Sequence, residues 1–232
     1  MYGRMRILGM VLAVVGIGFL AGGAFTGYKT YEGQQSLAAL SNAQQVKLTY
    51  NDQGQLTDHG DAASAQAILS LLRDEWKYPV NTGDLDPNDP IVNTATEFMF
   101  QMATITHHIT SGTQTVVLPK DVTAADGTVY KAGTYQFPVD GRYFSQFNRA
   151  NPIEGAARDQ AWSATGLALI SNLGVGTATA TALQLGLGIA ALFAGFGVFA
   201  LIAGFGLVWV ARAASEEERA PKVALQRRAM PA

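Results

Sequence analysis

The residues best suited to chemistry in this chain are its three histidines, His59, His107 and His108. A zinc or non-haem iron centre would need two histidines and a carboxylate converging on one point. On a helix, neighbouring side chains project about 100° apart, so His107 and His108 could share an ion only if the helix ended beside them, which Ser111 and Gly112 would permit. The favoured interpretation is that both are partly exposed histidines at a helix end, where positive charge suits the helix dipole. We therefore expect no metal site.

The other motifs that could carry chemistry are incomplete. The acidic segment 84–89 starts like a calcium loop, but Asp89 and Ala95 occupy the places where an EF-hand needs glycine and glutamate. No serine lies in a Gly-x-Ser-x-Gly elbow, and no phosphate-binding glycine loop follows a strand. The chain has no cysteine, which excludes disulfides and thiolate ligands. We expect no catalytic residue and no cofactor, so the protein is predicted not to be an enzyme.

Two long and largely apolar stretches of the chain contain no Asp, Glu, Lys or Arg, from Ile7 to Tyr28 and from Gln160 to Ala211. About 20 apolar residues cross the hydrocarbon of a bilayer as a helix, and lipid offers backbone groups no other partner. The pattern predicts transmembrane helices over residues 7–27 and 183–211. A cleavable secretory signal is the alternative for the first stretch. Its apolar run is longer than a usual signal core, so we expect a retained anchor.

The charges that flank the apolar stretches differ in sign from those between them. The two ends carry 7 basic and 3 acidic side chains, whereas residues 29–159 carry 9 basic and 15 acidic ones. The positive-inside bias then places both termini in the cytoplasm and the middle outside the plasma membrane. Basic ends beside an anionic leaflet need no nucleic-acid partner, and none is expected. The predicted organisation is a cytoplasmic N-terminus (1–6), a first span (7–27), an extracytoplasmic domain (28–182), a second span (183–211) and a cytoplasmic basic tail (212–232).

Capping residues and apolar spacing predict that the extracytoplasmic domain is mainly helical. The first span is expected to continue outward as a helix to Gln45. Asp61 then caps a helix that ends before Pro79, and Asn151-Pro152 begins a last helix that leads to the second span. Asp89-Pro90 predicts the start of another helix. The apolar residues at helical spacing are Ala65, Ile68, Leu69, Leu72 and Trp76 in the former helix, and Ile91, Ala95, Phe98, Met102, Ile105 and Ile109 in the latter.

Residues 113–147 change to strand-like composition. Three β-branched or aromatic runs, 115–118, 128–131 and 134–139, are separated by Asp-Gly and Ala-Gly pairs that are typical of hairpin turns. A small hairpin or three-stranded flap is predicted here. Because isolated hairpins are marginally stable in water, it should pack on the helices or on another subunit.

The second neutral stretch is 52 residues long, more than twice what a bilayer requires. Residues 160–182 are therefore expected to form an outer segment that packs on the other helices, with a kink conceivable at Gly174–Gly176. An alternative use of this excess is an apolar pocket for a lipid or a quinone-like molecule. Its candidate lining residues are Phe98, Met102, Trp162 and Leu169.

Glycine spacing within both spans predicts close helix packing. Small residues four apart let membrane helices approach closely, and seven-residue steps do the same along a coiled-coil seam. The candidate helix-packing residues are Gly18, Gly22, Gly23 and Gly27 in the first span and Gly188, Gly195, Gly197 and Gly204 in the second. No charged residue lies inside either span, which argues against ion conduction, proton relay and voltage sensing.

Four segments together carry a resemblance to a known group: the glycine-rich first span (6–23), the run 56–69, the segment 82–90 and the second span. The chain resembles a family of uncharacterised small actinobacterial two-span membrane proteins, whose members are often labelled aromatic ring-opening dioxygenase. The region 113–147 looks like an insertion relative to shorter members. Such dioxygenases hold iron through histidines and a carboxylate, and the sequence predicts no such ligand set. We therefore expect the label to be wrongly assigned.

The resulting prediction is a mainly α membrane protein with two transmembrane helices and an extracytoplasmic helical-bundle domain that carries a small β-hairpin insertion. The leading functional hypothesis is a non-catalytic cell-envelope protein that acts in assembly, as a homo-oligomer or as an accessory subunit of a larger membrane complex. Its expected partners are the lipid bilayer, copies of itself or other membrane subunits. A lipid- or quinone-binding protein is the alternative, and a metal-dependent enzyme is the third hypothesis.

Overall fold

The structure is a computed structural model that describes residues 2–228, with side chains described to residue 216. The chain forms two compact units. The first contains residues 1–35 and 182–232, and the second contains residues 36–181. Met1 and residues 229–232, which belong to the predicted cytoplasmic ends, lie outside the described residues.

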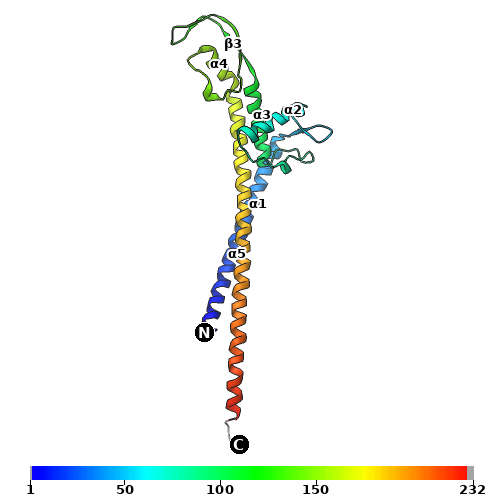
Figure 1. Cartoon of the computed structure of the whole chain (residues 1–232), viewed down its shortest axis with the longest axis vertical. Helices are drawn as coiled ribbons and strands as arrows, with labels where there is room; N and C mark the ends of the chain where they lie inside the picture. Colours follow the sequence, from blue (N-terminus) through cyan, green and yellow to red (C-terminus); the bar gives the residue numbers. More distant parts are fainter. Residues whose placement is uncertain (1, 229–232) are drawn as a thin grey trace. The chain divides into compact units, whose positions relative to one another are not determined.

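The first unit is built from the two longest helices, α1 (Tyr2–Gln44) and α5 (Ala164–Arg228), labelled in Figure 1. Each contains an 18-residue window with a mean hydropathy above 2, and only 17% of each window is buried. Both are thus long and apolar enough to cross a membrane, whereas the core helix of a water-soluble protein would be mostly buried. The predicted helices over 7–27 and 183–211 are confirmed as helices.

The two helices of the first unit run antiparallel and meet along small residues. A Cβ added to Gly9 would lie 2.6 Å from the carbonyl oxygen of Gly204, and one added to Gly16 would lie 2.9 Å from that of Gly197. Gly23 approaches Ala190 in the same way. The pairs follow one another every seven residues on both helices, which is the spacing of a coiled-coil seam.

The second unit begins with a short hairpin and a capped helix. Strands β1 (Thr49–Tyr50) and β2 (Leu56–Thr57) pair antiparallel. Asp61 then caps α2 (Ala62–Ser70) by accepting the amide hydrogen of Ala63, as the sequence predicts. One turn of π-helix, η1 (Leu71–Glu75), follows and ends before Pro79. The predicted apolar stripe is buried at Ala65, Ile68, Leu69 and Leu72.

The predicted helix start at Asp89-Pro90 is wrong, because α3 runs from Ala95 to Ser111. Its N-terminus is a capping box in which Thr94 accepts from the amide of Glu97 and Glu97 accepts from that of Thr94. The residues before it are extended. The carbonyl of Pro90 accepts the amide of Leu48, and Ile91 forms an isolated β-bridge with Lys47. Pairing with the chain after α1 therefore holds Ile91 outside the helix.

The strand-rich region 113–147 forms two antiparallel ladders. Strand β3 (Thr113–Leu118) pairs with β6 (Gly133–Pro138), and the shorter β4 (Val122–Thr123) pairs with β5 (Val129–Tyr130). The predicted hairpin is confirmed, with its tip near Gly127, which has a φ of 86°. Its inner face packs on α4 (Pro152–Ala161) through a core of Val116, Leu118 and Ala157. Asn151 caps α4 and Pro152 opens it, as predicted.

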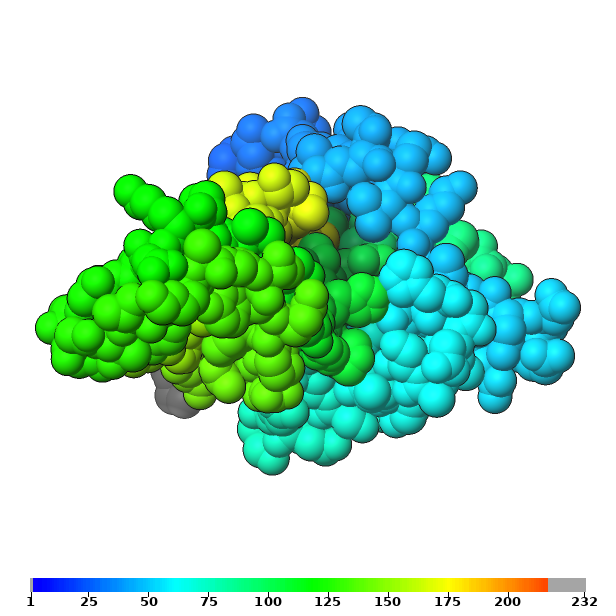
Figure 2. Space-filling view, turned by 90° about the horizontal axis from the view of Figure 1, so that it is seen from above, coloured from blue at the N-terminus to red at the C-terminus, as the bar shows by residue number. Residues whose placement is uncertain are grey.

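A break at residues 162–163 separates α4 from α5, so the predicted last helix is two helices. The outer segment of α5 then packs on α3. The ring of Phe98 lies 2.7 Å from the position of a Cβ on Gly176, and Ile109 makes an ordinary contact of 3.4 Å with that on Gly166. The helix is continuous through Gly174–Gly176. Short 3₁₀ turns, η2 (Thr82–Asp84) and η3 (Phe144–Gln146), complete this unit. Figure 2 shows α2 (cyan) and the hairpin region (green) on opposite sides of one of its faces.

Candidate functional site

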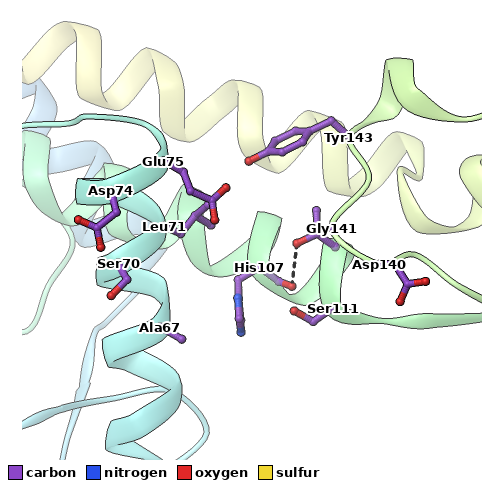
Figure 3. Close-up of a pocket in the computed structure, with 11 residues that line it drawn as sticks. Ala67, Ser70, Leu71, Asp74, Glu75, His107, Ser111, Asp140, Gly141 and Tyr143 are labelled. Atoms are coloured by element: carbon purple, nitrogen blue, oxygen red, sulfur yellow. Dashed lines mark hydrogen bonds between the residues drawn. The ribbon is translucent and has the colours of Figure 1, made fainter.

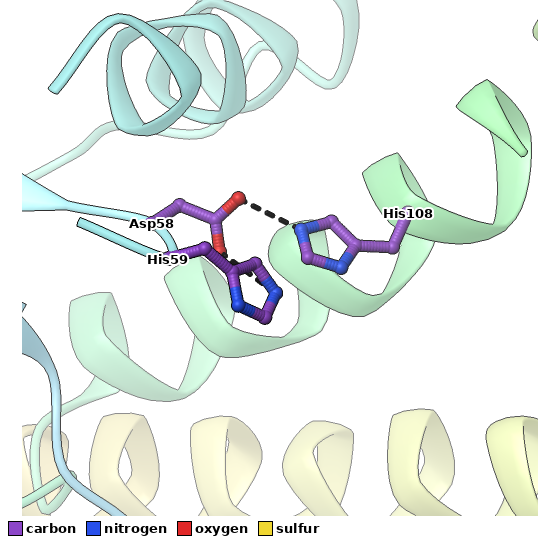
Figure 4. Close-up of side chains that lie close together, drawn as sticks. All are labelled: Asp58, His59 and His108. Atoms are coloured by element: carbon purple, nitrogen blue, oxygen red, sulfur yellow. Dashed lines mark hydrogen bonds and ion pairs between the residues drawn. The ribbon is translucent and has the colours of Figure 1, made fainter. Parts of the chain in front are cut away.

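Two of the three histidines and one carboxylate meet between α3 and the turn that precedes α2 (Figure 4). The donor atoms of Asp58, His59 and His108 all lie within 4.8 Å of one another. Nε2 of His108 lies 2.7 Å from Oδ2 of Asp58, and Nε2 of His59 lies 3.9 Å from Oδ1. The two imidazole rings stack, with centroids 4.9 Å apart and planes inclined by 25°. We call these three residues the histidine–aspartate group.

A tight turn places Asp58 and His59 in this group. The backbones of Asp58 and Asp61 exchange two hydrogen bonds of 3.0 and 2.9 Å across His59 and Gly60. His59 has a φ of 50° and Gly60 a φ of 83°. Positive φ at both central residues is what a type I′ turn requires, and histidine is one of the few residues other than glycine that tolerate it. The turn therefore fixes the backbone of His59 next to that of Asp58, and the exposed imidazole lies beside the carboxylate.

Asp58 is the buried and best-anchored member of the group. Its side chain is 9% exposed, whereas those of His59 and His108 are 80% and 39% exposed. The hydroxyl of Ser64, in the first turn of α2, donates to Oδ2 of Asp58 over 2.7 Å. Burial alone would raise the pKa of Asp58, but hydrogen bonds from Ser64 and His108 outweigh it, so the pKa lies below its usual value. The carboxylate is thus held in its charged form.

The group opens onto a cleft of about 460 Å³ that all three histidines line. His107 lies next to His108 on α3, with ring centroids 6.0 Å apart. Ser64, Asp61, Ser111 and Gly112 complete the walls, so the cleft is polar and open to solvent. Small polar molecules and ions therefore have access to the donor atoms of the group.

A second, larger cleft of about 700 Å³ lies on the other side of His107 (Figure 3). Its walls come from three elements: α2 with η1, the C-terminal turns of α3, and the turn at Asp140–Gly141. Asp140 has a φ of 50°, and the amide of Gly141 donates to the carbonyl of Thr110 over 3.0 Å. Its lining includes the acidic residues Asp74, Glu75 and Asp140 and the apolar residues Ala67 and Leu71.

The four residues of the predicted apolar pocket occupy different surroundings. Phe98 is buried against Gly176, and Trp162 stacks on Tyr143 and donates its indole hydrogen to the carbonyl of Arg142. Leu169 is 49% exposed, and Met102 is half-buried on α3. None of these four side chains lines the clefts described above, and an apolar pocket formed by them stays a prediction.

The predicted helix-packing glycines divide into two sets. Gly22, Gly23, Gly197 and Gly204 lie tightly against the opposite helix, and Gly27 makes an ordinary contact with Ala190. A Cβ on Gly18, Gly188 or Gly195 would meet open space within the chain. Of the predicted pairs four residues apart in the first span, Gly23 and Gly27 both contact α5, whereas Gly18 of the other pair does not; the closest backbone approaches recur every seven residues. Sequence reasoning missed Gly9, Gly16, Gly33 and Gly186, and the seven-residue interval from Gly9 to Gly16 to Gly23 was the available signal.

Sequence reasoning also missed the grouping of His59 with His108. These residues are separated by 49 positions, and only the fold of β2, α2 and α3 brings them together. The adjacent pair His107 and His108 was the visible pattern. Comparison with known proteins adds nothing to this picture, because no family model, no curated protein and no solved structure matches the chain.

Proposed function

We propose that this chain is a non-catalytic, two-pass integral membrane protein that acts in assembly, either as a homo-oligomer or as an accessory subunit of a larger membrane complex. The single observation that carries the proposal is the exposure of bulky apolar side chains on the paired helices. Phe25 is 65% exposed, Phe199 is 71% exposed and Ile202 is 68% exposed. Water penalises such a surface in proportion to its area, whereas lipid does not.

The way the helices meet supports retention of the first as an anchor. Small residues line the contact, so the large side chains point outward, and the two backbones approach closely enough for van der Waals packing. That is the main source of helix association in a bilayer, where apolar side chains gain nothing by leaving lipid. Loss of the first 24 residues would leave Gly197 and Gly204 without their partners, Gly16 and Gly9.

The absence of cysteine allows a direct test of topology by single-cysteine labelling. We expect Ala125→Cys, at the exposed hairpin tip, to react with a membrane-impermeant thiol reagent in intact cells. Ala213→Cys, on the exposed face of α5 beyond the apolar stretch, should react only after permeabilisation. The cysteine-free parent is the blank, and lysed cells give the maximum labelling of each variant. Equal labelling of both variants in intact cells would contradict the proposed orientation.

Assembly is tested by native mass spectrometry of protein extracted gently from membranes. We propose that the outward glycines of α5, Gly188 and Gly195, contact a second copy or another subunit, since neither contacts α1. The expected result is a complex of more than one chain that falls apart in a Gly188→Leu, Gly195→Leu double variant. A Gly188→Ala, Gly195→Ala double variant is the matched control, because a Cβ at either position meets nothing within 4 Å and alanine keeps the small residues that close helix contacts in a membrane need. A monomeric wild-type protein would contradict this role.

A lipid- or quinone-binding function is a second candidate, favoured by an apolar groove of about 330 Å³ between α1 and α5. The groove is lined only by apolar side chains: Leu12, Val15, Phe19, Phe196, Phe199, Ala200 and Ala203. The same mass spectra test it. A lipid or quinone that stays bound to the wild-type chain and is lost from an Ala200→Leu, Ala203→Leu variant would favour this function.

A further inference from the structure

The histidine–aspartate group has the donor set of a transition-metal site. Two imidazole nitrogens and one carboxylate oxygen suit first-row divalent ions such as Zn²⁺, Fe²⁺ and Co²⁺. Calcium would need about six to eight oxygen ligands, and the group offers one carboxylate. These donor atoms therefore favour a transition-metal ion such as Zn²⁺ over a hard ion such as Ca²⁺.

The geometry requires only a small adjustment to hold such an ion. Metal–ligand bonds of about 2.0 to 2.2 Å put neighbouring donor atoms about 3 to 3.5 Å apart. The most distant pair in the group lies within 4.8 Å and must close by roughly 1 to 2 Å, whereas Nε2 of His108 and Oδ2 of Asp58, 2.7 Å apart, must separate by about 0.5 Å as the ion replaces their hydrogen bond. His59 is the member free to make this movement, since its side chain is 80% exposed. Asp58 is held in place by Ser64, as a metal-binding carboxylate usually is by an outer hydrogen bond.

Two features of the surroundings agree with this assignment. Three protein ligands would leave at least one coordination position, and the cleft of about 460 Å³ gives it access to solvent. The second feature is the turn at His59, where a non-glycine residue occupies positive φ. Such conformations concentrate at functional sites, because the surrounding structure must hold them there. Here the turn aims His59 at a carboxylate that already has a partner in His108.

We propose that Asp58, His59 and His108 bind one divalent transition-metal ion of the Zn²⁺ type, with water in the remaining coordination positions. His107 lies outside the ligand set, although it lines the same cleft. The proposal goes beyond the membrane role and does not rest on it, because ligation involves only the second unit. If metal binding is disproved, the proposed membrane role is therefore unaffected, and the reverse also holds.

The test is Zn²⁺ titration of the full-length protein in detergent, treated first with a chelator and carrying no histidine tag. Isothermal calorimetry of the wild-type chain should give one site per chain. His59→Asn and His108→Ala should each weaken Zn²⁺ binding at least about tenfold, since each removes a ligand. Asparagine keeps the positive φ of the turn, and His59 is exposed, so this variant should remain folded. His107→Asn is the matched control and should bind as the wild type does.

Co²⁺ provides a second readout that does not depend on affinity alone. Its visible absorption bands report nitrogen and oxygen ligation, so they should appear with the wild-type and His107→Asn proteins and be lost with His59→Asn. Thermal unfolding of each apo-protein checks that the fold is intact. The proposal is overturned if the wild-type chain shows no saturable Zn²⁺ binding, or if His59→Asn binds as tightly as the wild type. It is also overturned if His107→Asn weakens binding as much as His59→Asn does.

Discussion

Glu97 is a charged side chain in a place where charge is costly. It is 1% exposed, and its Oε2 accepts the backbone amides of Asn93 and Thr94 over 2.9 and 2.8 Å at the start of α3. Burial raises the pKa of Glu97 above its ordinary value of 4.5, and the hydrogen bonds only partly oppose this. Burial of the Tyr50 side chain, followed by the negative charges of Glu97, Asp86 and Asp89, raises the pKa of Tyr50 to about 12.

A pH dependence of stability follows from the raised pKa of Glu97. The folded chain holds this proton more tightly than the unfolded chain, so stability falls as the pH rises from about 4.5 through the raised pKa. Glu97→Gln cannot ionise and should lack this fall. We expect the melting temperature of the wild type, followed by tryptophan fluorescence in detergent, to drop relative to that of Glu97→Gln across this range. Parallel melting curves at every pH would show that Glu97 does not titrate there.

Single residues could be predicted from the sequence where their role is local. Asp61 and Asn151 cap helices as predicted, because a cap needs only the next few residues of the chain. His59 and Asp58 could not be assigned in this way. Their meeting with His108 depends on a turn, a helix and a non-local contact, and no residue near any of them in the sequence signals it.

At the scale of elements, the start of α3 shows how two local signals compete. Asp89-Pro90 and Thr94 with Glu97 are both sound helix-start patterns. The second prevails because the backbone of residues 90–92 pairs with that of 46–48, which a helical Pro90 and Ile91 could not do. The hairpin 113–138 was predictable because alternating β-branched residues and Asp-Gly turns are local signals, and only its packing on Ala157 is not.

A substitution in α5 can test whether the close contact at Gly204, and not the glycine content of the helix as such, holds α1 and α5 together. A Cβ on Gly204 would lie 2.6 Å from the carbonyl oxygen of Gly9 and 2.8 Å from the amide nitrogen of Ala13. Both are backbone atoms, so the helices must move apart. Gly204→Leu should cost about 1 to 3 kcal/mol of helix association or more. Spin labels on cysteines at Val11 and Val210, which are both exposed, should report a longer and broader distance distribution.

Gly206→Leu is the matched control, because a Cβ on Gly206 meets nothing within 4 Å. It adds the same apolar bulk two residues further along the same helix. The distance between the labels should stay at its wild-type value. A change in the control as large as that in Gly204→Leu would mean that the tight contact between Gly9 and Gly204 does not hold the helices together.

At the scale of the whole molecule, the amino-acid composition predicts that the chain has two long apolar helices, but it says much less about how these helices pack. The two uncharged stretches predict two long apolar helices, and the structure has them. The start of the second span at residue 183 stays a prediction; the two compact units of the structure divide between residues 181 and 182 and between residues 35 and 36. Which glycines form the seam was less accessible, because both spans are rich in glycine and several spacings compete.

The evenly spaced small residues of α1 and α5 also make their alignment ambiguous. Gly9, Gly16 and Gly23 recur every seven residues, as do Ala190, Gly197 and Gly204, so a slip by one repeat would again set small residue against small residue. Side chains that do not repeat every seven residues must therefore select one alignment of α1 against α5. Phe19 does so by meeting Phe193 edge-on at 5.6 Å and Phe196 at 5.9 Å. If the ring of Phe19 were truncated, α1 could shift along α5 by one seven-residue repeat without any change in secondary structure.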